Sequence, residues 1–172
     1  MKKIEFYLKQ GQVKKDKTVV NLAQKYLNKS KNNLVTMQIL LEIQINKKAI
    51  ELLKIPKNYD SNEWAVICGY YAMYSAALSL IASIGFRSKN HSATIAILEE
   101  YFVKKRHLNK EDLQLIKNAL FQKEEIEKLS EAKHKREIAQ YSVTKQTTKE
   151  IVEKIKKDAY NFVNKSEEIL QK

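Results

Sequence analysis

One uncharged stretch constrains the fold of this chain more than any other feature. The 23 residues from Trp64 to Phe86 read WAVICGYYAMYSAALSLIASIGF and carry no charge, although 30% of the 172-residue chain is charged. A run of this length either spans a bilayer or forms the central helix of a packed bundle.

Two details of the stretch favour the bundle. Three tyrosines lie in its first half rather than at its two edges, where a membrane span carries its aromatic residues: Tyr70, Tyr71 and Tyr74. Three serines follow at four-residue intervals and form one stripe on a helix: Ser75, Ser79 and Ser83. We expect a buried helix whose serine stripe lets another helix approach closely, with a membrane span as the alternative.

The composition is that of an all-α protein. Three glycines and one proline leave little turn chemistry for a β-rich fold, and 172 residues suffice for one domain with a single core. The lone Cys68 can form no internal disulfide, and we expect a buried, reduced thiol. The first residues hold no apolar run of signal-peptide length, so a cytoplasmic protein is expected.

Hydrophobic periodicity predicts an antiparallel bundle of about five helices. Residues 1–17 are expected to form a tail, or a short strand at residues 4–8, and residues 18–172 a single domain. Helices are expected to start near Thr18, Ser61, Asn90, Asn109 and Thr147, with a short piece before Pro56. Gly85 is the expected left-handed residue that ends the uncharged helix, and Thr147 and Glu150 form a capping box.

The net charge of +12 is unevenly distributed. Residues 1–57 contribute +9, residues 58–98 are neutral and residues 99–172 contribute +3. Such an excess of lysine raises the affinity for phosphate backbones without giving sequence specificity. Ordinary solvated lysine explains the charge equally well, so polyanion binding stays open.

Several kinds of site find no support in the sequence. The glycines stand alone, so no phosphate-binding loop is present, and the three histidines lack the spacing of zinc ligands. We therefore expect no cofactor and no metal, and any catalysis would use Arg, His, Tyr or Lys.

Two clusters could bind a phosphate. The first runs from Arg87 through Lys89 to His91 at the start of a helix, where free N–H groups attract anions. The second combines His134 with Arg136 and Tyr141, and the adjacent cations are Lys133 and Lys135. Arginine can stabilise charge on a scissile phosphate, and histidine can transfer a proton near neutrality. An ordinary N-cap loop and a solvated basic helix end are the plain alternatives.

The order of these segments resembles one known family. GYYAMYSAALSLIASIGFRSKNHSATIAILEEYF, followed some forty residues later by REIAQYSV and an amphipathic last helix, is similar to the HEPN domain family, in its small archaeal and bacterial members. NLAQKYLNKSKNNL at residues 21–34 matches the family's first helix. The resemblance covers roughly residues 18–170 and implies a helical bundle, frequent homodimers, RNA or nucleotide binding, and a nucleotidyltransferase partner in a toxin–antitoxin-like pair.

The family's ribonuclease signature is incomplete in this chain. Many HEPN proteins cleave RNA without metal, using an Arg followed four to six residues later by a His; Arg136 matches the arginine, but Tyr141 stands where the histidine is expected. Ser75 also stands where relatives often carry a histidine. The leading hypothesis is a dimeric HEPN-type partner of a nucleotidyltransferase that binds RNA or a nucleotide through the Arg136/Tyr141 region, without fast cleavage. The alternatives are an active endoribonuclease toxin, in which His134 or Tyr141 replaces the missing histidine, and a structural bundle that sequesters a partner.

Overall fold

The chain folds as an all-α bundle with one small β-ribbon. The computed structural model describes residues 3–136 and 149–172, with side chains described at residues 4–127 and 149–172. Its elements in chain order are α1 (Lys3–Lys9), β1 (Val13–Lys15), a 3₁₀ turn (Lys17–Leu22), α2 (Ala23–Glu42), α3 (Lys47–Leu52), α4 (Asn62–Ser83), β2 (Phe86–Ser88), α5 (His91–Leu98), a π-helical turn (Glu99–Val103), α6 (Lys110–Arg136) and α7 (Lys149–Leu170). The predicted fold class is confirmed.

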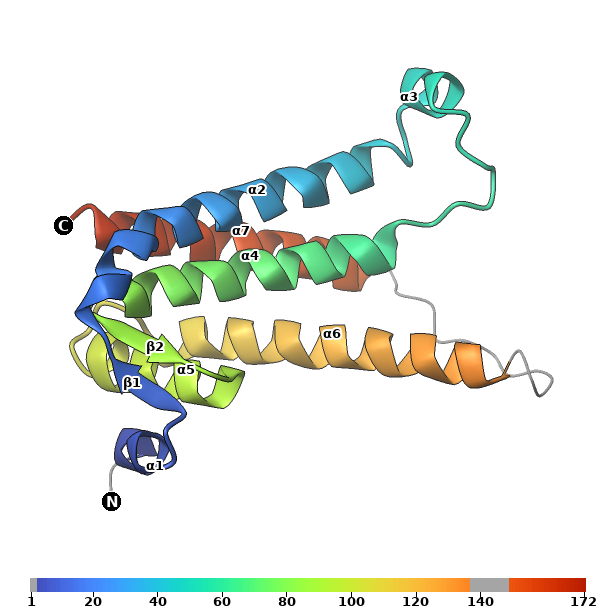
Figure 1. Ribbon diagram of the computed structural model, residues 1–172. Helices are drawn as coiled ribbons and strands as arrows, with labels where there is room; N and C mark the ends of the chain where they lie inside the picture. Colours follow the sequence, from blue (N-terminus) through green and yellow to red (C-terminus); the bar gives the residue numbers. More distant parts are fainter. Residues whose placement is uncertain (1–2, 137–148) are drawn as a thin grey trace.

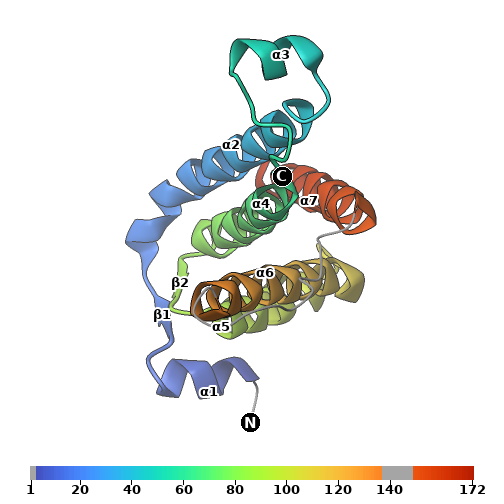
Figure 2. The same ribbon diagram turned by 90° about the vertical axis from the view of Figure 1, so that its right-hand side faces the viewer.

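Helix α4, which contains most of the uncharged stretch, lies at the centre of the bundle. Helices α2 and α7 pack along one side of it and α6 along the other, with α5 below, as the two views in Figures 1 and 2 show. Among the described residues α4 is the one helix long and apolar enough to cross a membrane, and 72% of its most apolar window is buried by the other helices. It is therefore the core helix of the bundle, as the tyrosine and serine positions predict.

Small residues let α2 approach α4 closely. The Ser79 hydroxyl donates to the Ala23 carbonyl at 2.6 Å, and the Ser30 hydroxyl of α2 donates to the Ala72 carbonyl at 2.8 Å. Both serines are fully buried, so these bonds satisfy groups that would otherwise cost stability. The close approach predicted for the serine stripe is confirmed at Ser79, and Ser30 contributes from the opposite helix.

Gly69 plays the same part on the side of α4 that faces α7. A Cβ atom at this position would lie 2.6 Å from Cγ2 of Ile155 and 3.1 Å from Sδ of Met37. Real Cβ atoms do not come that close to neighbouring carbons, so the spacing of α4 and α7 depends on glycine here.

The N-terminal region differs from the sequence-based expectation. Residues 4–8 are helical, within α1, and the expected strand lies instead at β1. It pairs antiparallel with β2, in a register that sets Lys14 opposite Arg87, and no sequence pattern predicts this partner strand. Three-residue strands show little periodicity in the sequence. Their pairing also joins segments some seventy residues apart, so neither strand indicates its partner.

Most of the predicted helix ends hold, but α2 begins at Ala23, after the 3₁₀ turn, rather than near Thr18. Gly85 has a φ of +73°, and the Asn90 side chain accepts from the Ala93 N–H at the start of α5. Asp60 accepts from the Asn62 N–H, while Ser61 donates to the Leu40 carbonyl rather than capping α4. Thr147 of the predicted capping box lies outside the described residues.

Cys68 is less deeply placed than expected. Its side chain is half-buried rather than buried, it is a free thiol, and partial burial raises its pKa. Cys68 packs against the hydrophobic core, and a thiol held in its protonated form is a weak nucleophile.

Candidate functional site

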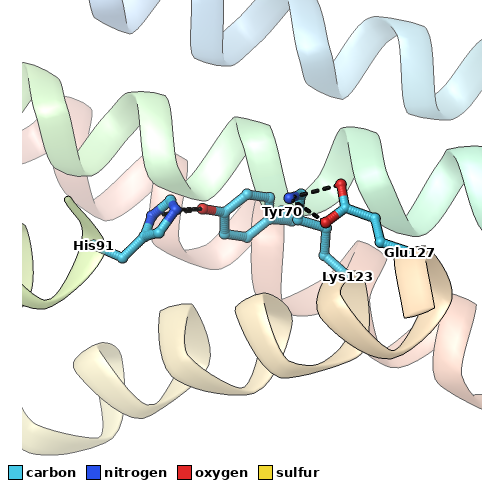
Figure 3. A network of polar contacts seen from close by, with 4 residues as sticks. All are labelled: Tyr70, His91, Lys123 and Glu127. Carbon is cyan, nitrogen blue, oxygen red and sulfur yellow. Dashed lines mark hydrogen bonds and ion pairs between the residues drawn. The ribbon is translucent and has the colours of Figure 1, made fainter. Parts of the chain in front are cut away.

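A network of polar side chains joins α4, α5 and α6. Tyr70 projects from α4 with its ring fully buried, and its hydroxyl lies 2.8 Å from Nδ1 of His91 at the first turn of α5 (Figure 3). Two further tyrosines contact this pair. The centroid of the Tyr74 ring lies 4.4 Å from that of the His91 imidazole, and the centroid of the Tyr71 ring lies 5.0 Å from that of the Tyr70 ring. The tyrosines of the YYAMY segment and His91 therefore form one contact cluster.

Tyr70 and His91 are both neutral near pH 7. Burial lowers the pKa of His91, and the Lys123 ammonium lowers it further. Burial also raises the pKa of the Tyr70 phenol far above its ordinary range. A hydrogen bond between a neutral phenol and a neutral imidazole fits the buried site, because neither group then carries an unpaired charge.

Hydroxyl groups extend the network toward β2. The Thr94 hydroxyl lies 2.6 Å from that of Ser88 and donates to the Asn90 carbonyl at 3.1 Å. The Tyr74 hydroxyl approaches the Thr94 hydroxyl at a longer 3.4 Å. These contacts fix the start of α5 against both the ribbon and the central helix.

An ion pair of α6 covers the tyrosines. The Lys123 ammonium lies 2.8 Å from Glu127 and about as far from the Tyr70 ring centroid as from the Tyr71 centroid, 5.6 and 5.8 Å. The bond to Glu127 raises the pKa of Lys123, so the ammonium stays charged over the aromatic faces. The cluster thus consists of mutually satisfied groups, which suits it to holding three helices together.

The β-ribbon and the residue that follows it carry a group of exposed cations. Lys14 of β1 stands directly opposite Arg87 of β2, and both side chains are exposed, as is Lys89 just beyond β2. Arg87 is held by Asp16, whose Oδ2 lies 2.9 Å from the guanidinium Nε. The Thr18 hydroxyl and N–H bind the same carboxylate and, together with Arg87, lower its pKa.

Comparison with known proteins identifies the family. No family model matches the chain. A protein of Archaeoglobus fulgidus named "UPF0332 protein" is 30% identical over 134 residues, which are 77% of this chain and 96% of that protein. The chain belongs to the UPF0332 family. The name of this relative states no activity, so the function of this chain is inferred from its own residues.

In this UPF0332 chain the residues of the two predicted phosphate sites occupy distant places. Arg87 lies on the ribbon and Lys89 follows it directly, while the His91 side chain turns into the tyrosine cluster. The backbone of the second cluster, Lys133 to Arg136, forms the last turn of α6. That helix has 27 residues and so spans about 40 Å at ~1.5 Å per residue, and the ribbon lies toward its opposite end (Figure 1).

The second cluster itself is not described in atomic detail. The side chains of Lys133, His134, Lys135 and Arg136 are outside the described set, and Tyr141 lies outside the described residues altogether. The assignments of Arg136, His134 and Tyr141 to catalysis therefore stay predictions. Within residues 4–127 and 149–172 of this UPF0332 chain, no group of three His, Cys, Asp or Glu side chains could hold a metal ion.

Proposed function

We propose that this protein is a HEPN-type helical protein that binds RNA or a nucleotide through phosphate contacts. The observation that carries the proposal is the cross-strand pair of Lys14 and Arg87, with Lys15 and Lys89 exposed on the same ribbon. Like charges directly opposite each other destabilise a ribbon, and the single carboxylate of Asp16 offsets only part of that charge. A bound phosphate would remove the remaining repulsion, and the chain's net charge of +12 favours such a ligand.

The HEPN assignment draws support from the tyrosine cluster. The two segments whose order suggested the family, YYAMY and SKNHSAT, are in contact through Tyr70, Tyr74 and His91. Contact between the two segments supports the view that their residues belong to one structural feature of the family. An all-α bundle around α4 agrees with the same assignment.

Binding without fast cleavage is the form of the activity that we propose. His91, the histidine nearest to the ribbon, is neutral and bonded to a buried phenol, and no histidine follows Arg136 at the spacing of the nuclease signature. One general acid or base contributes roughly 10²–10⁴ to a rate. The endoribonuclease alternative keeps Arg136 with His134 or Tyr141 in the catalytic roles.

Fluorescence anisotropy with a labelled single-stranded RNA tests the ribbon. Lys14→Gln and Lys89→Gln should each weaken binding and reduce the slope of log K against log salt by about one, the effect of one lost phosphate contact. The matched control is Lys48→Gln, an exposed lysine of α3 at the far tip of the bundle (Figure 1), which should leave both quantities unchanged. Equal losses in all three variants would mean that the net charge, not the ribbon, attracts RNA.

A protein partner is the second part of the proposal. Exposed apolar side chains gather where α2 ends and α3 projects from the bundle: Ile45 is 73% exposed, Leu52 83% and Leu53 61%. Such surfaces mark protein–protein contacts, and we propose that this tip binds a nucleotidyltransferase in a toxin–antitoxin-like pair. Leu52→Glu should abolish co-elution with a nucleotidyltransferase encoded beside this chain, while Lys48→Gln should not. Co-elution that survives Leu52→Glu would move the contact elsewhere.

We also propose a homodimer in which the basic ends of the two α6 helices lie near each other across a two-fold axis. The motivation is the cluster of Lys133, Lys135 and Arg136 in the last turn of α6. Light scattering should give twice the chain mass of 20.1 kDa at tens of micromolar protein. A monomer at that concentration would contradict the dimer without touching the binding proposal.

A further inference from the structure

A cleft between α6 and α7 contains a carboxylate that its surroundings do not satisfy. Asp158 of α7 lines this cleft and is 9% exposed, and its Oδ2 is buried with no hydrogen-bond partner among the described residues. The cleft has a volume of about 310 Å³ and is lined by Asn118, Phe121, Gln122, Ile151, Lys154, Ile155 and Asp158.

The buried carboxylate is costly as it stands. Burial raises the pKa of Asp158, and the nearby ammonium groups of Lys154 and Lys157 counteract this only in part. Native proteins rarely keep a buried polar oxygen unpaired, and such an atom calls for a donor from outside the fold. The ligand best matched to Asp158 is therefore a group with hydrogen-bond donors.

The residues that line the cleft indicate the shape and polarity of the rest of the ligand. The Phe121 side chain is 57% exposed at its rim, and Ile151 and Ile155 add apolar surface from α7. Asn118 and Gln122 stand four residues apart on α6 and supply carboxamide groups. A flat ring with polar edges fits these walls, and the volume lies at the lower end of the ~300–1,000 Å³ seen for small-ligand sites. One nucleobase suits it better than an entire nucleotide.

Guanine is the base whose edge matches a carboxylate. It presents two adjacent donors, N1–H and the N2 amino group, whereas the pairing edges of adenine, cytosine and uracil each place an acceptor beside their donor. Two parallel N–H groups bind both oxygens of a carboxylate, the geometry that makes arginine–carboxylate pairs strong. The carboxamides of Asn118 and Gln122 can donate to the acceptors O6 and N7 on the other edge.

We infer that the α6–α7 cleft binds a guanine base, with Asp158 accepting from N1–H and N2–H while the ring stacks on Phe121. This inference rests on the proposed binding of RNA or nucleotide and names the base that is recognised. Oδ2 is buried in the structure, so this binding mode requires the Asp158 carboxylate to turn toward the cleft about its broad terminal torsion.

Calorimetric titration with nucleoside monophosphates tests the cleft. Guanosine monophosphate should bind at least tenfold more tightly than the adenosine, cytidine or uridine forms. Inosine monophosphate, which lacks the N2 amino group, should fall in between. Asp158→Asn should weaken guanosine monophosphate binding about 10–100-fold, in line with the ~1–3 kcal/mol of a bidentate base contact. Glu168→Gln, an exposed carboxylate on the same helix, is the matched control and should change nothing.

Phe121→Ala provides a second variant, because an exposed ring can be removed without unfolding the protein. It should lower the affinity for all four nucleotides and leave the preference for guanine intact. A single-stranded oligonucleotide containing guanine, compared with an all-adenine one, distinguishes RNA from free nucleotide as the source of the base.

The outcomes separate the two proposals. Equal binding of the guanosine and adenosine forms, or guanosine binding that survives Asp158→Asn, would overturn the guanine site. If RNA still binds with a salt slope that depends on Lys14, the phosphate-binding proposal stands without it. If neither RNA nor any nucleotide binds, both fail.

Discussion

The contact at Gly69 gives the sharpest prediction for the fold. Gly69→Ala adds a methyl group 2.6 Å from Cγ2 of Ile155 and 3.1 Å from Sδ of Met37. The methionine can move, since its side chain is flexible, but Ile155 is branched at Cβ, almost fully buried and fixed on α7.

Two opposing terms set the size of the effect. Alanine is favoured over glycine in a helix interior by about 1 kcal/mol. Forcing a methyl group into a packed core costs about 1–3 kcal/mol, and the rigid neighbour argues for the upper part of that range. We therefore expect a net loss of about 1–2 kcal/mol in the free energy of unfolding. For a chain of this size the midpoint of thermal unfolding should fall by roughly 2–8 °C.

A double-mutant cycle identifies the cause. Urea unfolding followed by circular dichroism should show that Gly69→Ala/Ile155→Ala is less destabilised than the sum of the single variants by about 1–3 kcal/mol. Gly69→Ala/Val163→Ala is the matched control, because Val163 lies two turns further along α7 and should give additive effects. A single Gly69→Ala variant that is more stable than the wild type would refute the close approach of α4 and α7.

Two further predictions concern buried polar groups. Tyr70→Phe should lower the free energy of unfolding by about 1–2 kcal/mol, measured in urea, because the half-buried imidazole of His91 loses its partner; no loss would mean that the contact is not formed. The pKa of Asp158 is raised in the folded state, so the wild type should lose stability relative to Asp158→Asn as pH rises from about 4, where the unfolded carboxyl ionises. Thermal unfolding of both proteins between pH 4 and 8 checks this, and parallel curves would contradict it.

The sequence predicts the bundle well because its main signals are local. Absence of charge identifies α4, four-residue spacing identifies the serine stripe, and Gly85 ends the helix through its own backbone freedom. Each of these depends on residues close together in the chain, so no knowledge of the partner helices is needed.

Features that depend on contacts between distant segments cannot be predicted from local sequence patterns. The pairing of Lys14 with Arg87 joins three-residue strands across much of the chain, and α1 is a helix where a strand was expected. The residues around Gly69 in the sequence do not explain the glycine. Only the close approach of α7 shows why a side chain would not fit there.

The candidate site is predicted only in part. Arg87, Lys89 and His91 are neighbours in sequence, but the histidine turns inward to Tyr70 while the cations stay exposed. Helical spacing sets Asp158 three residues after Ile155 and four before Phe162, on the apolar face of α7, but only the tertiary fold shows that one of its oxygens is buried without a partner.

Incubation of the purified protein with an end-labelled RNA in EDTA tests the central claim most directly. The same samples are run on a native gel, which reports binding, and on a denaturing gel, which reports cleavage. We predict a shifted RNA that remains intact, with a shift that weakens as salt rises. Efficient cleavage by the wild type that is lost in Arg136→Ala would contradict binding without turnover and make the endoribonuclease the better account, and no shift even at low salt would contradict RNA binding itself.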